Sequence, residues 1–148
     1  MNRPIITIDG PGGAGKTTVS RILAEKLGYR YIDTGALYRA IALAVKSTQI
    51  DPDNPDEMEA LCRSLELKFV WIDNKLSLLS NGADITAKIR TPEVTMLASA
   101  VSAKPIVRRY LLELQRELGK NGGAVFEGRD MGTVVFPEAK IKFFLDAS

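Results

Sequence analysis

The sequence predicts an α/β fold with a parallel central sheet, interrupted by a small α/β insert. Three observations predict it: strand patterns alternate with amphipathic helix patterns at both ends of the chain, a dense turn cluster (DPDNP) occupies residues 51–55, and short strands with tight turns follow it. The 148 residues, 45% apolar and 26% charged, have the length and composition of one core-forming domain. A collagen, a disordered tail and a multidomain protein are therefore excluded.

The first 50 residues predict two successive strand–helix pairs. Residues 5–9 (IITID) are a β-branched apolar run between a proline and a glycine, which suits a strand buried on both faces. Residues 16–27 have apolar positions at helical spacing, and Gly28 supplies a stop. Residues 29–32 predict the second strand, and residues 37–45 carry the apolar stripe of the second helix.

The middle of the chain predicts a separate subdomain that begins at the turn cluster. Prolines at the expected helix starts and the turns Asp73-Asn74 and Asn81-Gly82 delimit its elements. The expected elements are a helix at residues 55–65, antiparallel strands at 67–72, 75–79 and 83–85, and helices at 92–102 and 105–120. We therefore expect a core of residues 1–50 and 103–148 and an insert of residues 51–102.

The last part of the chain predicts two more strands of the parallel sheet. Residues 124–126 form a brief apolar run closed by Glu127, which is typical of a central strand, and residues 140–145 predict another strand. A loop that contains Gly128-Arg129-Asp130 lies between them.

The charge balance and the missing residue types exclude several classes of function. The net charge of +2 is too small to indicate a nucleic-acid or membrane partner. The chain has no histidine, so histidine-dependent triads and His-ligated zinc sites are excluded, and its single cysteine, Cys62, is expected as a buried thiol. No membrane-spanning apolar run and no signal-peptide core are found, so we expect a cytoplasmic protein.

Residues 10–17 (GPGGAGKT) match the phosphate-loop pattern G-x-x-x-x-G-K-[ST] between a predicted strand and a predicted helix. Glycines let backbone N–H groups turn inward around a phosphate, and the helix N-terminus adds the positive end of its dipole. Lys16 would reach the β- and γ-phosphates of ATP, and Thr17 would bind Mg²⁺. A plain glycine-rich turn would need neither residue. The expected fold is therefore the P-loop NTPase three-layer fold.

The ATP-binding contacts expected from this loop cover one continuous segment. They are Gly10, Pro11, Gly12, Gly13, Ala14, Gly15, Lys16, Thr17 and Thr18. Asp9, directly before the loop, is either a strand-end cap or a group that touches the site.

A second group of polar residues is expected at the same edge of the sheet. Tyr38 and Arg39 follow the second strand and lie off the apolar stripe of their helix, while Arg129 and Asp130 follow a later strand. Ligands of open α/β folds bind at the carboxyl ends of the strands. Two arginines that converge there suit a phosphorylated acceptor facing ATP.

Four segments together resemble the bacterial cytidylate kinase family. They are residues 8–17 (IDGPGGAGKT), 33–39 (DTGALYR), 89–94 (IRTPEV) and 127–137 (EGRDMGTVVFP). The resemblance implies transfer of the γ-phosphoryl group of ATP to CMP or dCMP with Mg²⁺, in pyrimidine metabolism. It also implies that the insert is the enlarged nucleoside-monophosphate-binding region of the bacterial enzymes.

The resemblance assigns roles residue by residue. Lys16, Arg39 and Arg129 would be catalytic; Arg39 and Arg129 would hold the CMP phosphate with Tyr38 packed nearby. The other expected CMP-binding residues are Thr34, which retains a hydroxyl, and Ser99, Arg108 and Asp130, which read cytosine or sugar. Cytosine offers an amino donor and two acceptors, for which a carboxylate, an arginine and a hydroxyl are complementary. Glu127 could orient a water bound to Mg²⁺.

Plainer interpretations stay open beside these roles. Arg108 and especially Arg109 could be solvated helix charges, Arg90 could serve the site or the surface, and Tyr38 could be core packing. A kinase of another small metabolite would share the phosphate loop but would not need the insert.

The resemblance also implies a mobile lid, a last strand and a C-terminal helix that would follow Ser148. We therefore expect an incomplete core, an exposed apolar edge near Phe143 and Leu145, and either an enzyme or a nucleotide-binding fragment without turnover. The full-length form is expected to be a monomer.

Overall fold

The computed structural model describes residues 3–73 and 75–146. These residues form two compact units, which we call unit 1 (Met1–Gly35 with Leu112–Ser148) and unit 2 (Ala36–Leu111). The expected division into a core and an insert at residues 51–102 stays a prediction, because compactness does not say which residues bind a substrate.

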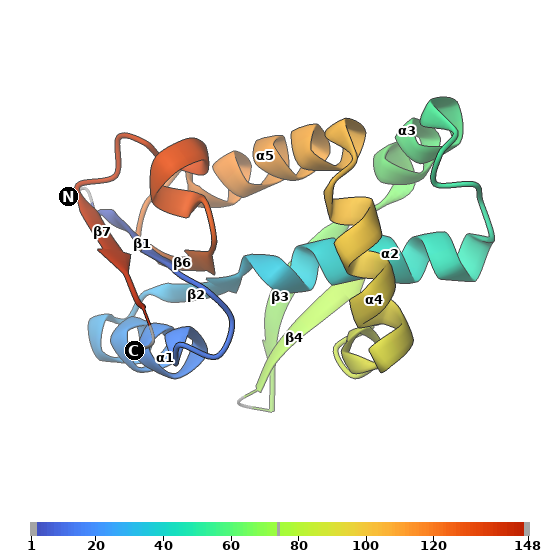
Figure 1. The fold of residues 1–148 in the computed structure, drawn as a ribbon. Helices are drawn as coiled ribbons and strands as arrows, with labels where there is room; N and C mark the ends of the chain where they lie inside the picture. Colours follow the sequence, from blue (N-terminus) through green and yellow to red (C-terminus); the bar gives the residue numbers. More distant parts are fainter. Residues whose placement is uncertain (1–2, 74, 147–148) are drawn as a thin grey trace. The chain divides into compact units, whose positions relative to one another are not determined.

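Unit 1 is built on a parallel sheet of four strands (Figure 1). In spatial order the strands are β2 (Arg30–Asp33), β6 (Ala124–Gly128), β1 (Ile5–Asp9) and β7 (Ile141–Phe144). Every residue of β6 is buried, as is expected for a strand between two neighbours and two covered faces. The parallel sheet and the central place of residues 124–126 are thus confirmed.

Helical elements cover both faces of this sheet. Helix α1 (Lys16–Leu27) packs on β1, β2 and β6. The π-helical turn η2 (Met131–Val135), orange-red in Figure 1, packs on β1 and β6 from the other side. This arrangement is the predicted α/β layering, and it leaves the loops after β1 and β6 at one edge of the sheet.

Two local predictions for unit 1 were inaccurate. The second strand begins at Arg30 and not at Tyr29, because the Tyr29 N–H bonds the Ala24 carbonyl (2.9 Å) and so closes the C-terminal turn of α1 behind left-handed Gly28. Strand β6 continues through Glu127 to Gly128. The helical turn η2 was not predicted at all.

Unit 2 contains helices and a small antiparallel sheet. Its elements are α2 (Thr34–Thr48), which begins in unit 1, α3 (Pro55–Ser64), β3 (Leu67–Ile72), β4 (Lys75–Ser80), β5 (Ala83–Asp84), the 3₁₀ turn η1 (Lys88–Arg90), α4 (Pro92–Ser102) and α5 (Pro105–Gly119), which ends in unit 1. The strand order β3-β4-β5 confirms the predicted antiparallel sheet. Asn74, in the expected turn Asp73-Asn74, lies outside the described residues.

The helix starts of unit 2 follow the prolines, as predicted. Asn54 caps α3 by accepting the N–H groups of Asp56 and Glu57, and Pro55 takes the first helical position, where no N–H is needed. No helix among residues 3–73 and 75–146 has the length and apolar character to cross a membrane.

Candidate phosphoryl-transfer site

The phosphate loop joins β1 to α1, and its glycines have the backbone conformations that the motif needs. Gly15, the residue before α1, has a left-handed φ of 83° and offers no side-chain cap, and the first turn of the helix has no acidic residue. At Gly10 (φ 148°) a Cβ would lie 2.1 Å from the Leu145 carbonyl oxygen, so only glycine fits. The uncapped, positive end of α1 is thus available to an anion.

The Lys16 ammonium lies between the phosphate loop and the end of β6. It donates hydrogen bonds to the carbonyl oxygens of Gly10 (2.6 Å) and Gly128 (3.0 Å), and the residue is 9% exposed. A positive charge is thus held where the two loops meet. In a phosphate loop the lysine neutralises the phosphates of the bound nucleotide, and that role stays a prediction for Lys16.

The Glu127 carboxylate, on β6, receives a hydroxyl hydrogen bond at each oxygen. The Thr17 hydroxyl donates to Oε2 (3.0 Å) and the Tyr31 hydroxyl to Oε1 (2.5 Å). Both Glu127 (8% exposed) and Tyr31 (6% exposed) are buried. Burial first, then the negative charges of Asp33 and Glu127, raise the pKa of Tyr31 far above its usual value, so the phenol stays a donor.

These oxygen groups suit Mg²⁺. A hydroxyl and a carboxylate are the hard ligands that this ion prefers, and Mg²⁺ commonly takes only one or two protein groups, with waters and phosphates completing its shell. Within residues 3–73 and 75–146, no cluster of three or more His, Cys, Asp or Glu side chains could enclose a metal by itself. Thr17, with Glu127 acting directly or through water, therefore fits a metal that arrives with a nucleotide.

Asp9 fixes the backbone that follows Arg129 and Asp130. Its two carboxylate oxygens accept the N–H groups of Met131 and Gly132, both at 2.8 Å, at the start of η2. These contacts support the capping role that was one of the two alternatives for Asp9, and a contact between Asp9 and a ligand stays a prediction. The side chain ties the end of β1 to the loop that carries the two predicted acceptor residues.

Arg129 lies beside the phosphate loop within unit 1. Its side chain is exposed, and a Cβ built on Gly12 would lie 3.7 Å from its Nη2 atom. Gly128, which precedes it, has no room for a side chain, because a Cβ there would lie 2.6 Å from the Thr34 hydroxyl oxygen. Lys16, Thr17, Glu127 and Arg129 are thus brought together at one edge of the sheet.

The Thr34 hydroxyl is buried and already has a partner. It donates to the Glu127 carbonyl oxygen (2.7 Å) and so links the end of β2 to β6. Toward a ligand it could only offer lone pairs. Asp130, partly buried, makes a polar interaction of its own.

The remaining predicted acceptor residues belong to unit 2. Tyr38 and Arg39 are half-buried on α2, whereas Ser99 on α4 and Arg108 on α5 are exposed. Arg90 and Arg109 are exposed as well. Convergence of these side chains with Arg129 stays a prediction.

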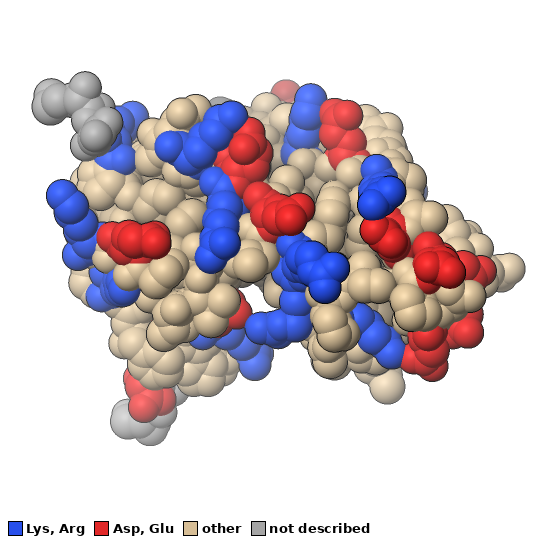
Figure 2. All heavy atoms as spheres, turned by 90° about the horizontal axis from the view of Figure 1, so that it is seen from above, with Lys and Arg blue, Asp and Glu red and all other residues tan. Residues whose placement is uncertain are grey.

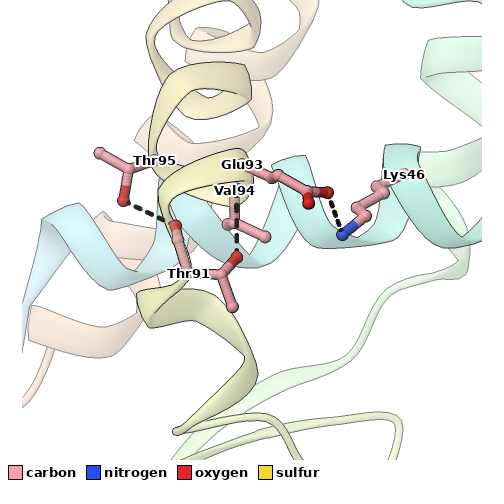
Figure 3. A network of polar contacts seen from close by, with 5 residues as sticks. All are labelled: Lys46, Thr91, Glu93, Val94 and Thr95. Carbon is pink, nitrogen blue, oxygen red and sulfur yellow. Dashed lines mark hydrogen bonds and ion pairs between the residues drawn. The ribbon is translucent and has the colours of Figure 1, made fainter.

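The segment IRTPEV has a structural role at the start of α4 (Figure 3). The Thr91 hydroxyl accepts the Val94 N–H (3.3 Å), the Thr95 hydroxyl donates to the Thr91 carbonyl oxygen (3.1 Å), and Glu93 pairs with Lys46 of α2 at 2.7 Å. The hydrogen bond and charge of Lys46 lower the pKa of the Glu93 carboxyl. The segment therefore caps the start of α4 and forms an exposed ion pair with α2.

Charged side chains of both signs are mixed on the surface (Figure 2), so binding of an anion would depend on groups close to it. On the face shown in Figure 2, lysine and arginine side chains are interspersed with aspartate and glutamate side chains. The net charge is only +2. A phosphate ligand would thus depend on the loop, Lys16 and nearby arginines, rather than on a long-range field.

Sequence reasoning missed Tyr31 as a member of the site. It lies in a predicted strand, where an aromatic ring is ordinary. The signal that could have found it is strand pairing: Asp33 is the partner of Glu127 in the β2–β6 register, and Tyr31 stands two residues earlier on the same face.

Comparisons with known proteins agree with these motifs. The family model for cytidylate kinase matches residues 6–148. The chain is 51% identical to the cytidylate kinase of Geobacter sulfurreducens over 97% of its length and 62% of that protein, and 52% identical to that of Syntrophotalea carbinolica over its whole length and 63% of that protein.

A bifunctional pantoate ligase/cytidylate kinase of Synechococcus elongatus is 49% identical over 99% of the chain and 29% of that protein. The chain thus spans less than two thirds of the length of the Geobacter and Syntrophotalea cytidylate kinases. The family match, the identity of about half of all positions and the phosphate-loop geometry lead to one conclusion: the chain belongs to the cytidylate kinase family.

Proposed function

We propose that the protein is an ATP-dependent nucleoside monophosphate kinase that transfers the γ-phosphoryl group of ATP to CMP or dCMP. The products are ADP and CDP or dCDP. The observation that carries this proposal is the meeting of Lys16, Thr17 and Arg129 at the carboxyl edge of the parallel sheet. The names of the family relatives point to the same reaction.

The donor side of the proposed site is the phosphate loop. Residues 10–18 would surround the β- and γ-phosphates of ATP with backbone N–H groups, and Lys16 would neutralise their charge. Mg²⁺ would be held by Thr17, with Glu127 acting through a water, and would supply further charge stabilisation during the transfer.

The acceptor side of the proposed site would consist of two arginines and several polar side chains. Arg39 and Arg129 would bind the CMP phosphate, with Tyr38 packed near it, since arginine suits bidentate contact with phosphate. Thr34, Ser99, Arg108 and Asp130 would contact cytosine or the sugar.

Phosphoryl transfer requires little covalent chemistry from the protein. An oxygen of the CMP phosphate is already an anionic nucleophile, so no general base is required. The protein has to bring the two phosphates in line and to stabilise their charge as it spreads. Because the reaction uses common intracellular nucleotides, we propose a cytoplasmic location. We also propose that the full-length form is a monomer.

An acceptor screen tests the proposal. ADP release from ATP and Mg²⁺ is measured with CMP, dCMP, UMP, AMP or shikimate as acceptor, beside calorimetric titration of CMP. We expect release that depends on CMP or dCMP. Release with shikimate would favour the small-metabolite kinase. CMP binding without release would assign a binding module without turnover, and absence of both would contradict the proposal.

A further inference from the structure

The Glu127 carboxylate is held by two hydroxyl groups that come from different elements of unit 1. Tyr31, on β2, donates to Oε1 at 2.5 Å, and Thr17, in the first turn of α1, donates to Oε2 at 3.0 Å. Glu127 lies on β6, the strand next to β2. The carboxylate thus bridges the neighbouring strand to the end of the phosphate loop.

The two partners of Glu127 differ in burial: Tyr31 is buried and Thr17 is exposed. A tyrosine side chain turns about two bonds, and burial of Tyr31 restricts both. Glu127 has three rotatable bonds and is buried as well, and its two hydroxyl partners fix the direction of its oxygens. Tyr31 is therefore the fixed point that decides the orientation of the carboxylate, and Thr17, exposed on its helix, is the group that responds to it.

We propose that Tyr31 is a positioning residue of the phosphoryl-transfer site, which holds Oε1 of Glu127 so that Oε2 faces the Thr17 hydroxyl. The proposal rests on the proposed function. When the Thr17 proton is donated to Oε2, the lone pairs of its oxygen are left for a metal that accompanies the nucleotide. Tyr31 thereby acts on metal-assisted nucleotide binding through two intermediate groups.

The length of the Glu127 side chain is part of the same arrangement. The side chain spans from the Tyr31 hydroxyl to the Thr17 hydroxyl with one carboxylate. An aspartate would be one methylene shorter and could not accept from both hydroxyls in their present places. The tyrosine and the glutamate therefore work as a pair.

Tyr31→Phe tests the proposal, because it keeps the buried ring and removes only the hydroxyl. Calorimetry measures ADP binding with Mg²⁺ and with EDTA. We expect a loss of about 10-fold or more in the affinity gained from Mg²⁺, with the EDTA value unchanged. Tyr29→Phe, on a ring that lies 4.6 Å from the Arg3 guanidinium, is the matched control and should change neither value.

The outcomes separate this proposal from the proposed function. If the unchanged chain binds no ADP in either buffer, the proposed function fails. If the unchanged chain gains affinity from Mg²⁺ and Tyr31→Phe gains as much, the positioning role is wrong. Turnover supplies a second readout: kcat should fall while the KM for CMP stays the same.

A second variant keeps the proposal testable if Tyr31→Phe does not fold, because it breaks the same bridge at Glu127. Glu127→Asp keeps the tyrosine but shortens the carboxylate, and it should lose the same Mg²⁺-dependent gain. Where both variants fold, the double variant should lose no more than either single one, because both substitutions break the same bridge. A full Mg²⁺-dependent gain in Glu127→Asp, or additive losses in the double variant, would overturn the proposal.

Discussion

Lys16 is the residue on which the donor half of the site depends. Its ammonium is nearly buried, and its two carbonyl partners place it between the loop after β1 and the end of β6. In the proposed reaction it neutralises charge that grows between donor and acceptor. Stabilisation of this kind at one group is commonly worth 10² to 10³ in turnover, roughly.

We therefore expect Lys16→Ala to lower CMP-dependent ADP release by several orders of magnitude, at least about 10²-fold. Lys26→Ala, in the exposed last turn of the same helix, should keep normal turnover. Circular dichroism should show both variants folded. Near-normal release by Lys16→Ala would refute the donor assignment.

Asp9 holds the backbone that follows Arg129 and Asp130 through two hydrogen bonds. Asp9→Asn replaces one acceptor oxygen by an NH₂ group that must face a backbone N–H. The loss of a charge-assisted bond should lower the free energy of unfolding by about 1.5–3 kcal/mol. The KM for CMP should rise, because Arg129 and Asp130 lose their support.

Urea unfolding and initial-rate kinetics measure both effects. Asp146→Asn, at an exposed position of unit 1, is the control for the change in charge. An unchanged stability in Asp9→Asn would show that the two 2.8 Å contacts contribute nothing.

Residues within one continuous motif were predictable, whereas residues joined across strands were not. The phosphate loop gives Lys16 and Thr17 directly, since spacing alone carries that signal. The contacts of Asp9 with Met131 and of Tyr31 with Glu127 join residues that are about a hundred positions apart, and only the strand register brings them together.

At the scale of elements, caps and turn residues decide the boundaries. The prolines at 55, 92 and 105 and the glycine at 28 placed most helix ends correctly, because each acts on the backbone of its own neighbours. The turn η2 has no such signal. It forms because Asp9, from a distant strand, binds its first N–H groups.

The cap of α4 provides a prediction at this scale. Thr91→Ala removes the hydroxyl that accepts the Val94 N–H, and it should cost about 1 kcal/mol of stability. Thr95→Ala is the matched control: its hydroxyl bonds only a carbonyl of the preceding turn, so the cost should be smaller. Equal losses in urea unfolding would show that the cap is not what fixes the start of the helix.

At the scale of the whole molecule, the packed core of unit 1 stabilises the strand β6, which carries Glu127 of the site. Phe126 is fully buried on β6, and its ring centroid lies 4.5 Å from that of Phe136. Phe126→Ala should lower the free energy of unfolding by about 3–5 kcal/mol. Phe144→Ala, at a ring that is 68% exposed, should change it little. Similar values for the two variants would contradict this account of the core.

Of the two residues at which the sequence led us to expect an exposed apolar edge, Phe143 is exposed, as predicted, whereas Leu145 is half-buried. Strand β7 is an edge strand of the described sheet, and both of its phenylalanines are exposed. A groove of about 380 Å³ beside it is lined by apolar residues of α1, β1 and β7, with Lys26. None of the predicted site residues lines that groove.

The fold class was predictable because the parallel strands appear as short apolar runs and most helices as apolar positions at helical spacing. Which residues of unit 2 contact an acceptor stays a prediction, because such contacts depend on the ligand rather than on local sequence pattern.

The central claim is that Lys16 and the arginines Arg39 and Arg129 serve one site for two phosphate groups. The direct measurement is the affinity of a compound that joins adenosine and cytidine through a chain of phosphates. We expect the protein to bind it much more tightly than ATP or CMP, and each of Lys16→Ala, Arg39→Ala and Arg129→Ala to weaken it about 10-fold or more. Binding no tighter than that of ATP alone, and unaffected by the arginine variants, would contradict the account.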